Sequence, residues 1–310
     1  MTEPLPEPLP EPISAPISAP TPGPVPTPSP TWDPQQYLRH ADHRTRPFRD
    51  LLARVGDLPG HPAPRIADLG CGAGNVTALL ADRWPRARVT GYDNSPQMLG
   101  QAAAHARPLL DFTRADAATW TPTETYGLIV SNALLQWLPG HVDRFPVWLD
   151  ALAPGGTFAF QVPGNFTAPS HTLLAALRES DRWRPLLHGV GDRTAAVLPP
   201  ADYLARLQDL GCEADVWETT YLQTLPGDDP VLDWVKGTAL RPVLTALADD
   251  REAHDAFLAE YRDLLRTAYP PGPHGTVFPF RRVFAVARKG GRRPAAGRCA
   301  GVRADSARPA

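Results

Sequence analysis

Short apolar runs alternate with amphipathic segments over most of this chain. The short runs have the length of buried strands, and the longer segments carry apolar residues three and four positions apart, the spacing of one helix face. Strands that alternate with helices predict parallel crossovers and an open α/β sheet. The predicted strands cover residues 65–69, 87–93, 110–116, 126–132, 157–162, 212–222 and 282–287.

The helical segments follow the same alternation until the last two strands. Predicted helices cover residues 76–84, 96–106, 141–152, 171–179, 201–210, 231–240 and 251–268. A further amphipathic pattern over 37–55 contains Pro47, and we expect this proline to interrupt the helix. About sixty residues separate the last two strands. Because this stretch is amphipathic, we predict a packed helical cap at about residues 223–279.

The two ends of the chain differ from the folded part in composition. Residues 1–31 repeat Glu-Pro and Ala-Pro units, and residues 290–310 are basic and rich in Gly, Ala and Pro. Neither segment has the apolar residues needed to form a core, so both are predicted to be disordered tails. One folded domain is therefore expected over residues 32–289.

Charge and cysteine content exclude several classes of function. The net charge of −2 gives no excess that would favour nucleic acid. The three cysteines are widely spaced, which fits neither a metal site nor a disulfide framework. The sequence has no apolar run of transmembrane length and no secretory leader pattern, so we expect a cytoplasmic protein that binds neither membranes nor metals.

A glycine-rich segment carries the first chemical signal. Asp68 stands in the first predicted strand, and Gly70, Gly72 and Gly74 follow it on alternate positions before a helix begins. Glycine lets a ligand approach the main chain closely, and a helix N-terminus offers free N–H groups to an anionic ligand group. Cys71, within this loop, is expected to pack rather than to act as a nucleophile.

Each of the next two predicted strands ends in an acidic residue. Asp93 ends the second strand, where an acid can hold a ribose diol beside the glycine loop. Asp116 ends the third strand, and Asn132 ends the fourth. A glycine turn in an unrelated α/β protein is the alternative, and Asp116 as a helix cap or Asn132 as a turn residue remain open.

The pattern D-L-G-C-G-x-G followed by G-x-D resembles the class I S-adenosylmethionine-dependent methyltransferases. The resemblance implies a Rossmann-like methyltransferase sheet with S-adenosyl-L-methionine as cofactor. It implies that Asp68 lies near the cofactor's ammonium and that Asp93 takes the ribose hydroxyls. It also implies that the glycine loop, Cys71 included, binds the amino-acid part of the cofactor. The remaining implied contacts are the adenine with Asp116 and Ala117, and the methyl-donor end with Asn132.

A second set of motifs narrows the resemblance. The segments W-D-P-x-x-Y from Trp32, N-A-x-L-Q-W from Asn132 and Q-V-P-x-N from Gln161 resemble the trans-aconitate 2-methyltransferase family, as does W-x-x-x-T-x-L-R-P from Trp234. The match covers residues 32–289, although Gly164 stands where the family usually has an acid. The family implies esterification of one carboxylate of trans-aconitate, which gives a monomethyl ester and S-adenosylhomocysteine.

The implied substrate is a small tricarboxylate, which calls for cationic partners. A carboxylate is already anionic at pH 7 and needs no general base, so no catalytic residue is expected beyond positioning groups. Arginine suits carboxylates because it binds them in bidentate fashion. The proposed substrate residues are Arg44, Arg46, Arg241, Gln136 and Trp137. Further candidates are Arg281, Arg282, His40, His43 and His171.

Each of these side chains could instead have a structural or surface role outside substrate binding. Any single arginine could be a solvated surface residue, and Trp137 could belong to the core. The chain could also methylate another small acid or a natural product, or bind the cofactor without catalysing transfer.

Overall fold

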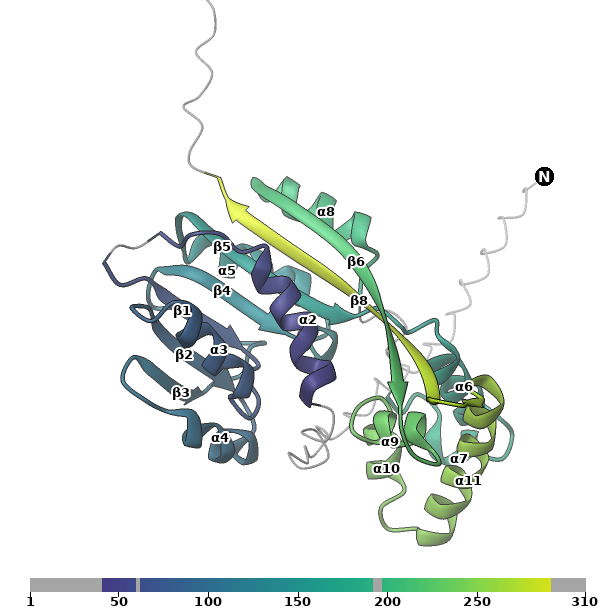
Figure 1. Cartoon of the computed structure of the whole chain (residues 1–310). Coiled ribbons are helices and arrows are strands. Elements are labelled where there is room, and N and C mark those ends of the chain that lie inside the picture. Colours follow the sequence, from purple (N-terminus) through teal and green to yellow (C-terminus); the bar gives the residue numbers. More distant parts are fainter. Residues whose placement is uncertain (1–40, 60–61, 192–196, 291–310) are drawn as a thin grey trace, which may run out of the picture.

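The computed structural model describes residues 41–59, 62–191 and 197–290, with side chains from Thr45 onward. One eight-stranded sheet has the order β3-β2-β1-β4-β5-β8-β6, with β7 paired to β8 (Figure 1). The strands β1 to β5 are parallel, and β8 runs antiparallel to β5 and β6. This confirms the predicted α/β sheet. The strands are β1 (Arg65–Leu69), β2 (Arg88–Asp93), β3 (Leu110–Arg114), β4 (Tyr126–Asn132), β5 (Leu152–Pro163), β6 (Cys212–Leu225), β7 (Pro271–Gly272) and β8 (Gly275–Lys289).

Helices cover both faces of the sheet, because its central strand is apolar on both sides. All of β4 is buried, and its side chains alternate between two cores. Leu128 and Val130 lie with α2 and α3, and Ile129 lies with α5 and α8. The helices around the sheet are α2 (Ala41–Ala53), α3 (Asn75–Arg83), α4 (Pro96–Ala102), α5 (Phe145–Asp150) and α8 (Pro200–Asp209), and the 3-10 turns are η1 (Ala103–His105), η2 (Leu135–Trp137) and η3 (His141–Arg144).

The predicted interruption at Pro47 is wrong. Helix α2 continues through Pro47, which lies inside it. A proline in a helix removes one backbone hydrogen bond. Phe48, Leu51 and Leu52 follow directly and are buried against the sheet, so their burial offsets that loss.

The helical insertion between the last two strands is present. It contains α9 (Pro230–Lys236), α10 (Arg241–Ala246) and α11 (Arg251–Ala268). Two helices from another part of the chain, α6 (Pro169–Arg178) and α7 (Arg184–Leu187), pack against it. Leu174 of α6 and Trp183 beside α7 share one core with Phe257 and Tyr261 of α11. We call these five helices the cap.

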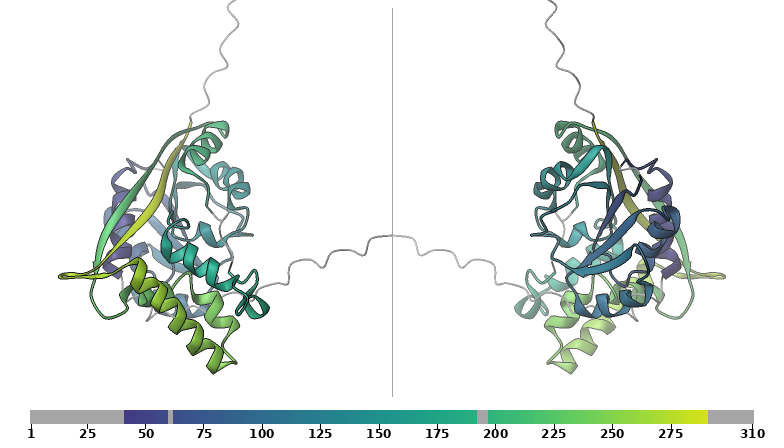
Figure 2. Two further views of the ribbon diagram at one scale, coloured as in Figure 1. Left: turned by 90° about the vertical axis from the view of Figure 1, so that its right-hand side faces the viewer. Right: turned by 90° about the vertical axis from the view of Figure 1, so that its left-hand side faces the viewer.

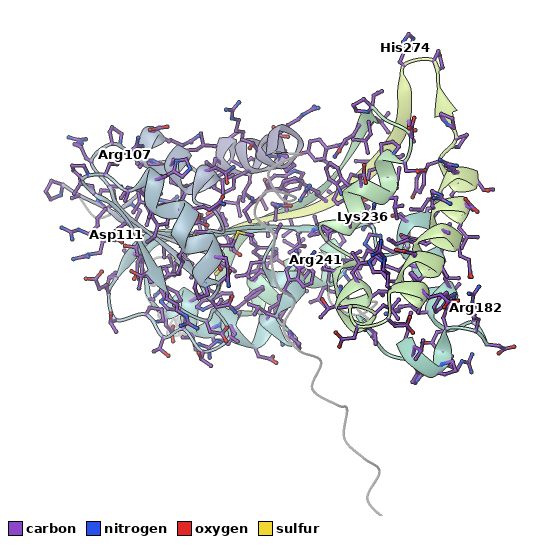
Figure 3. The ribbon with its side chains drawn as sticks, turned by 90° about the horizontal axis from the view of Figure 1, so that it is seen from below. Arg107, Asp111, Arg182, Lys236, Arg241 and His274 are labelled. Carbon is purple, nitrogen blue, oxygen red and sulfur yellow. The ribbon has the colours of Figure 1, made fainter. Side chains whose placement is uncertain are left out.

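Strands β6 and β8 join the sheet to the cap. Their pairing runs unbroken from Cys212 opposite Lys289 to Leu225 opposite Thr276, so the ribbon is longer than the predicted strands. The cap lies beyond one end of the sheet, where this ribbon reaches it (Figures 1 and 2). His274 marks the tip of the hairpin that β7 and β8 form beside the cap (Figure 3).

Two features are absent from the described residues. None of their helices combines the length and the hydropathy needed to cross a bilayer. Their His, Cys, Asp and Glu side chains form no group of three or more that could hold a metal ion.

Candidate active site

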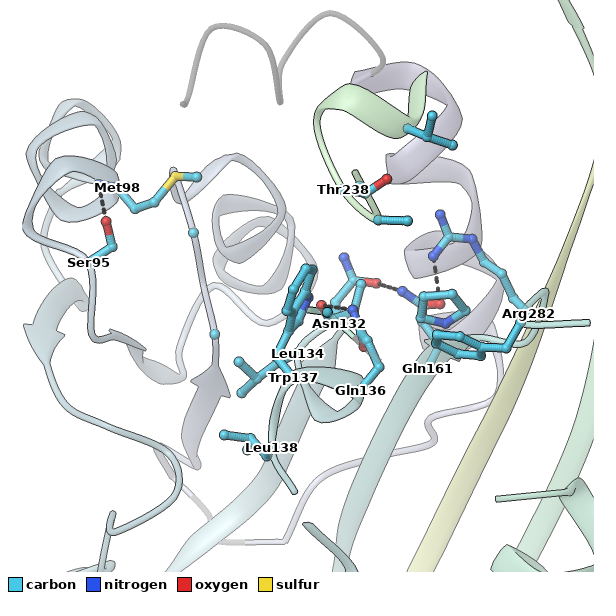
Figure 4. A pocket seen from close by; sticks show the side chains of 18 of the residues that line it. Ser95, Met98, Asn132, Leu134, Gln136, Trp137, Leu138, Gln161, Thr238 and Arg282 are labelled. Atoms are coloured by element: carbon cyan, nitrogen blue, oxygen red, sulfur yellow. Dashed lines mark hydrogen bonds between the residues drawn. The ribbon is translucent and has the colours of Figure 1, made fainter. Parts of the chain in front are cut away.

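A cavity of about 870 Å³ lies between the sheet and the cap. It starts at the carboxyl ends of β1, β2 and β4, where a doubly wound sheet leaves a crevice for ligands. Its lining includes Gly70, Gly72, Asp93, Asp116, Asn132, Gln136, Trp137, Gln161, His171, Arg178, Trp234, Thr238, Phe280 and Arg282. Figure 4 shows the part of this lining around Asn132, Gln161 and Arg282. The cavity therefore has a glycine-loop end and a cap end.

The glycine loop presents its backbone to the cavity. Gly72 has φ of 56°, and a Cβ atom there would meet nothing within 4 Å, so the main chain stays open to a ligand. Gly70 also lines the cavity. Gly74 has a different position: it precedes α3, and a Cβ atom there would approach Phe112 Cζ to 2.8 Å. Its requirement for glycine thus comes from packing and from its left-handed φ of 81°.

Asp93 is fixed beside this loop. Its Oδ2 accepts a hydrogen bond from the Gly72 backbone N–H at 2.9 Å, and its Oδ1 accepts one from the Ser95 N–H at 2.9 Å. Burial raises the pKa of Asp93, while the bonds from Ser95 and Gly72 oppose the rise. The two bonds set the direction of a carboxylate that lines the cavity.

Asp68 lies in the core behind the loop and is not among the cavity-lining residues. Its Oδ2 accepts a hydrogen bond from Thr77 Oγ1 at 2.7 Å, and its Oδ1 has no partner among the described residues. Burial raises the pKa of Asp68 to about 7, against the lowering effect of Thr77. An orphaned buried carboxylate oxygen next to the glycine loop fits an incoming cationic group.

Cys71 and the segment after β3 complete the glycine-loop end. The Cys71 thiol is buried and contacts the Gly72 carbonyl at 3.7 Å; burial raises its pKa far above the usual range, which leaves it inert. Asp116 lines the cavity, and its Oδ1 also accepts a bond from the Ala118 N–H at 2.9 Å, so it caps a turn as well. Ala117 is half-buried and is not among the lining residues.

Three buried polar side chains connect the end of β4 to β8. Gln161 Nε2 donates to Asn132 Oδ1 at 2.5 Å, and Arg282 Nη1 donates to Gln161 Oε1 at 2.9 Å (Figure 4). Asn132 and Gln161 are opposite each other in β4 and β5, so the strand register brings them together. The chain of bonds orients all three side chains at the wall of the cavity.

Gln136 and Trp137 lie on the short turn η2 that follows Asn132. Ala133, between β4 and this turn, has φ of 58°, a strained backbone for a residue with a Cβ atom. Gln136 Nε2 donates to the Ala133 carbonyl at 2.6 Å, whereas its buried Oε1 has no partner among the described residues. An unpartnered amide oxygen therefore belongs to the cavity wall beside Asn132.

Two of the arginines proposed from the sequence, Arg46 and Arg241, are not in the cavity lining. Arg46 is exposed, and its guanidinium lies 5.1 Å from the centre of the Tyr221 ring. Arg241 begins α10 and is half-buried outside the lining (Figure 3). The side chains of Arg44, His40 and His43 lie outside the described residues. Arg281 points away from the cavity wall formed by Arg282 and bonds to Glu218 at 2.9 Å.

Among the described residues, three other arginines line the cavity: the exposed Arg114 at the end of β3, and the buried Arg178 and Arg282. Arg282, named above only as a further candidate, is 4% exposed, and Arg178, which the sequence reasoning missed, is 6% exposed. The sequence pattern could have shown that Arg282 is buried. Residues two apart in a strand lie on the same face, and Phe278, Phe280 and Phe284 share the buried face of Arg282. Arg178 follows Leu174 by four residues on the buried face of α6, which was the equivalent helical signal.

Charge is unevenly distributed between the two ends. Of the described residues that line the cavity, the acids are Asp93 and Asp116, both at the glycine-loop end, where the exposed Arg114 of β3 also lines it. The cap end has Arg178 and Arg282, together with His171, whose pKa burial lowers to about 4. His171 is thus neutral at pH 7, and the two guanidinium groups favour an anionic ligand there.

Comparisons with known proteins agree with this geometry. A model described as a methyltransferase domain matches residues 66–156. A protein of Streptomyces coelicolor named trans-aconitate 2-methyltransferase is 66% identical over 83% of this chain and 86% of its own length. Proteins of the same name from Streptomyces avermitilis and Mycobacterium tuberculosis are 66% and 46% identical, over 83% and 86% of this chain and 97% and 100% of their own.

Among solved structures, phosphoethanolamine N-methyltransferase 2 of Haemonchus contortus in complex with S-adenosyl-L-methionine aligns with 79% of this chain and 52% of that chain. The identity is 18% and the TM-score is 0.48, a likeness too distant to add to the argument.

Proposed function

Because this chain belongs to the trans-aconitate 2-methyltransferase family, we propose that it transfers a methyl group from S-adenosyl-L-methionine to a carboxylate of trans-aconitate. The products are the monomethyl ester and S-adenosylhomocysteine. One observation carries the proposal: two buried arginines line the end of a cavity whose other end is a glycine loop with a fixed aspartate.

The residues at the glycine-loop end fit the cofactor. The open backbone at Gly72 would receive its amino-acid part, and the fixed carboxylate of Asp93 would hold the ribose hydroxyls. The unpartnered Oδ1 of Asp68 would favour the cofactor's ammonium, directly or through water. Asp116 and Ala117 would serve the adenine, with Asp116 contributing the carboxylate in the cavity wall.

When bound, the cofactor would supply an electrophilic methyl group to a carboxylate oxygen of the acceptor, with S-adenosylhomocysteine as the leaving group and no need for proton transfer. The protein's part is then to align the acceptor and to exclude water. Asn132 and Gln136 would line the position of the transferring group, and the unpartnered oxygen of Gln136 would favour positive charge there. The cap would cover the acceptor.

A transfer assay with methyl-labelled S-adenosylmethionine tests the proposal. Trans-aconitate, cis-aconitate, citrate and isocitrate are compared as acceptors at equal concentration. The proposal expects the highest kcat/KM with trans-aconitate. A higher kcat/KM with another acid would move the activity to that acceptor, and cofactor binding without transfer to any acid would indicate a non-catalytic homologue.

A further inference from the structure

We infer that Arg178 and Arg282 hold the two carboxylates of the acceptor that are not methylated. The site therefore selects acids with three carboxylates, two for the arginines and one for the methyl group. This inference rests on the proposed function and adds to it the division of labour among the carboxylates.

Arg282 forms a rigid cationic wall on the sheet side. Its guanidinium lies 4.7 Å from the centre of the Phe280 ring and donates to Gln161 at 2.9 Å. Gln161 in turn is held by Asn132. A guanidinium binds carboxylates through charge-assisted, often bidentate hydrogen bonds, so this buried side chain in the cavity lining suits a carboxylate of the acceptor.

Arg178 forms a second wall from the cap. It ends helix α6, and its Nη1 donates to the carbonyl of Val190. The start of this helix is fixed by α11, because Tyr261 Oη donates to the Ser170 carbonyl at 2.5 Å and the Ser170 N–H donates to Tyr269 Oη at 3.0 Å. The two arginines thus approach the cavity from separate elements, β8 and α6, as two distinct carboxylate subsites.

The charge change of the reaction decides which carboxylates these are. Methylation consumes the negative charge of the reacting carboxylate as its ester forms. An arginine paired with that group would stabilise the starting anion more than the transition state, and would slow the reaction. Pairing with the other carboxylates carries no such penalty, since their charge persists throughout. The reacting carboxylate therefore belongs beside the neutral amide of Asn132, which also lines the cavity.

The test removes an arginine and a carboxylate separately and together. Trans-aconitate is compared with mesaconate, glutaconate and itaconate, each of which lacks a different one of its three carboxylates. Dissociation constants are measured by calorimetry on enzyme loaded with S-adenosylhomocysteine, and KM and kcat are measured by methyl transfer. The proteins are wild type, Arg178→Gln, Arg282→Gln and the charge-retaining Arg282→Lys. Arg251→Gln is the matched control, because Arg251 is an exposed arginine on the cap helix α11.

Each Gln variant should weaken trans-aconitate binding by about ten- to hundredfold, with a larger effect on KM than on kcat. One diacid should bind Arg282→Gln as well as it binds wild type, and a different diacid should do so for Arg178→Gln. Arg282→Lys should recover part of the loss, and Arg251→Gln should match wild type.

If removing a given carboxylate weakens binding by the same factor in wild type and in each variant, the losses are additive and the inference is overturned. Transfer of methyl groups to trans-aconitate would in that case leave the proposed function intact. If trans-aconitate neither binds nor is methylated by the wild type, the proposed function and the inference both fail.

Discussion

At the scale of single residues, Asp93 contributes more than a charge, since it also accepts the N–H of Gly72 in the glycine loop. Asp93→Ala removes the proposed acceptor for the ribose and releases that loop contact. We expect S-adenosylhomocysteine to bind about ten- to hundredfold more weakly. Calorimetry measures this, with Asp111→Ala as control, because Asp111 is an exposed acid on β3 (Figure 3). Unchanged affinity would remove Asp93 from the cofactor site.

The raised pKa of Asp68 should make the free energy of unfolding depend on pH. Its pKa is about 7 in the folded protein and about 3.9 in an unfolded chain. Between these values the folded protein keeps a proton that the unfolded chain has lost, so the free energy of unfolding falls as pH rises. Asp68→Asn should flatten this fall, by about 1.4 kcal/mol per pH unit at most. Urea denaturation at pH 5, 6 and 7 measures it; the slope of Asp111→Asn should remain that of wild type, and an equal slope in Asp68→Asn would refute the prediction.

The glycine-loop end could be predicted from the sequence because its residues are neighbours in the chain or end adjacent strands. Gly70, Gly72 and Asp93 all line the cavity. The cap end could not be predicted in the same way. Whether an arginine faces a cavity depends on the packing of its whole element, which is why Arg178 was missed and Arg46 was favoured.

At the scale of elements, helix α2 is held to the sheet by stacked cations and a hydrogen bond. Arg46 lies over Tyr221, and Arg54, just after the helix, lies 4.3 Å from the centre of the Trp217 ring. Tyr221 also donates to Asp50 at 2.6 Å. We therefore expect Arg46→Ala to lower the free energy of unfolding by about 0.5–1 kcal/mol.

The same variant distinguishes this docking role from substrate binding. With trans-aconitate, KM for Arg46→Ala should stay within about twofold of wild type, since the side chain is outside the cavity lining. A tenfold rise in KM with unchanged stability would return Arg46 to the substrate site. Denaturation curves and initial-rate kinetics on the same preparations measure both quantities.

Helix α6 depends on α11 for its position. Tyr261→Phe removes the hydroxyl that donates to the Ser170 carbonyl and leaves a buried acceptor without that bond, which costs about 1–3 kcal/mol of stability. Because α6 carries His171 and Arg178, KM for trans-aconitate should rise several-fold while S-adenosylhomocysteine affinity stays unchanged.

Tyr126→Phe is the matched control for this prediction. Its hydroxyl contacts Tyr92 at 3.3 Å at the start of β4, away from the cap. It should leave KM unchanged. Equal effects of the two variants on KM would mean that the loss of a buried hydroxyl, rather than the position of α6, controls acceptor binding.

The elements themselves were predicted unevenly, for physical reasons. Periodicity placed α11 and the strands β1 to β4 well, whereas β6 and β8 extend beyond their predicted ends. The predicted helix over 231–240 instead ends at Lys236, and a new helix begins at Arg241. Gly237 follows the first helix, and Pro242 suits the first turn of the next. Pro47 was misjudged because local propensity was overridden by burial of the residues after it.

At the scale of the whole molecule, the site is formed by a sheet crevice and a cap that come from separate parts of the chain. The insertion was predicted, but its partnership with α6 and α7 was not. Residues 91 positions apart, Ser170 and Tyr261, meet in that contact, and no local pattern encodes such a pairing. The result is one cavity with Asp93 and Asp116 at one end and the buried Arg178 and Arg282 at the other.

The central claim is that this cavity esterifies a carboxylate, and the labelled product tests it most directly. Wild-type enzyme, methyl-labelled S-adenosylmethionine and trans-aconitate are incubated, and the product is analysed by mass spectrometry before and after mild alkali. We predict one added methyl group per trans-aconitate, released as labelled methanol by alkali together with intact trans-aconitate. A methyl group that resists alkali, or no transfer to trans-aconitate at all, would contradict it.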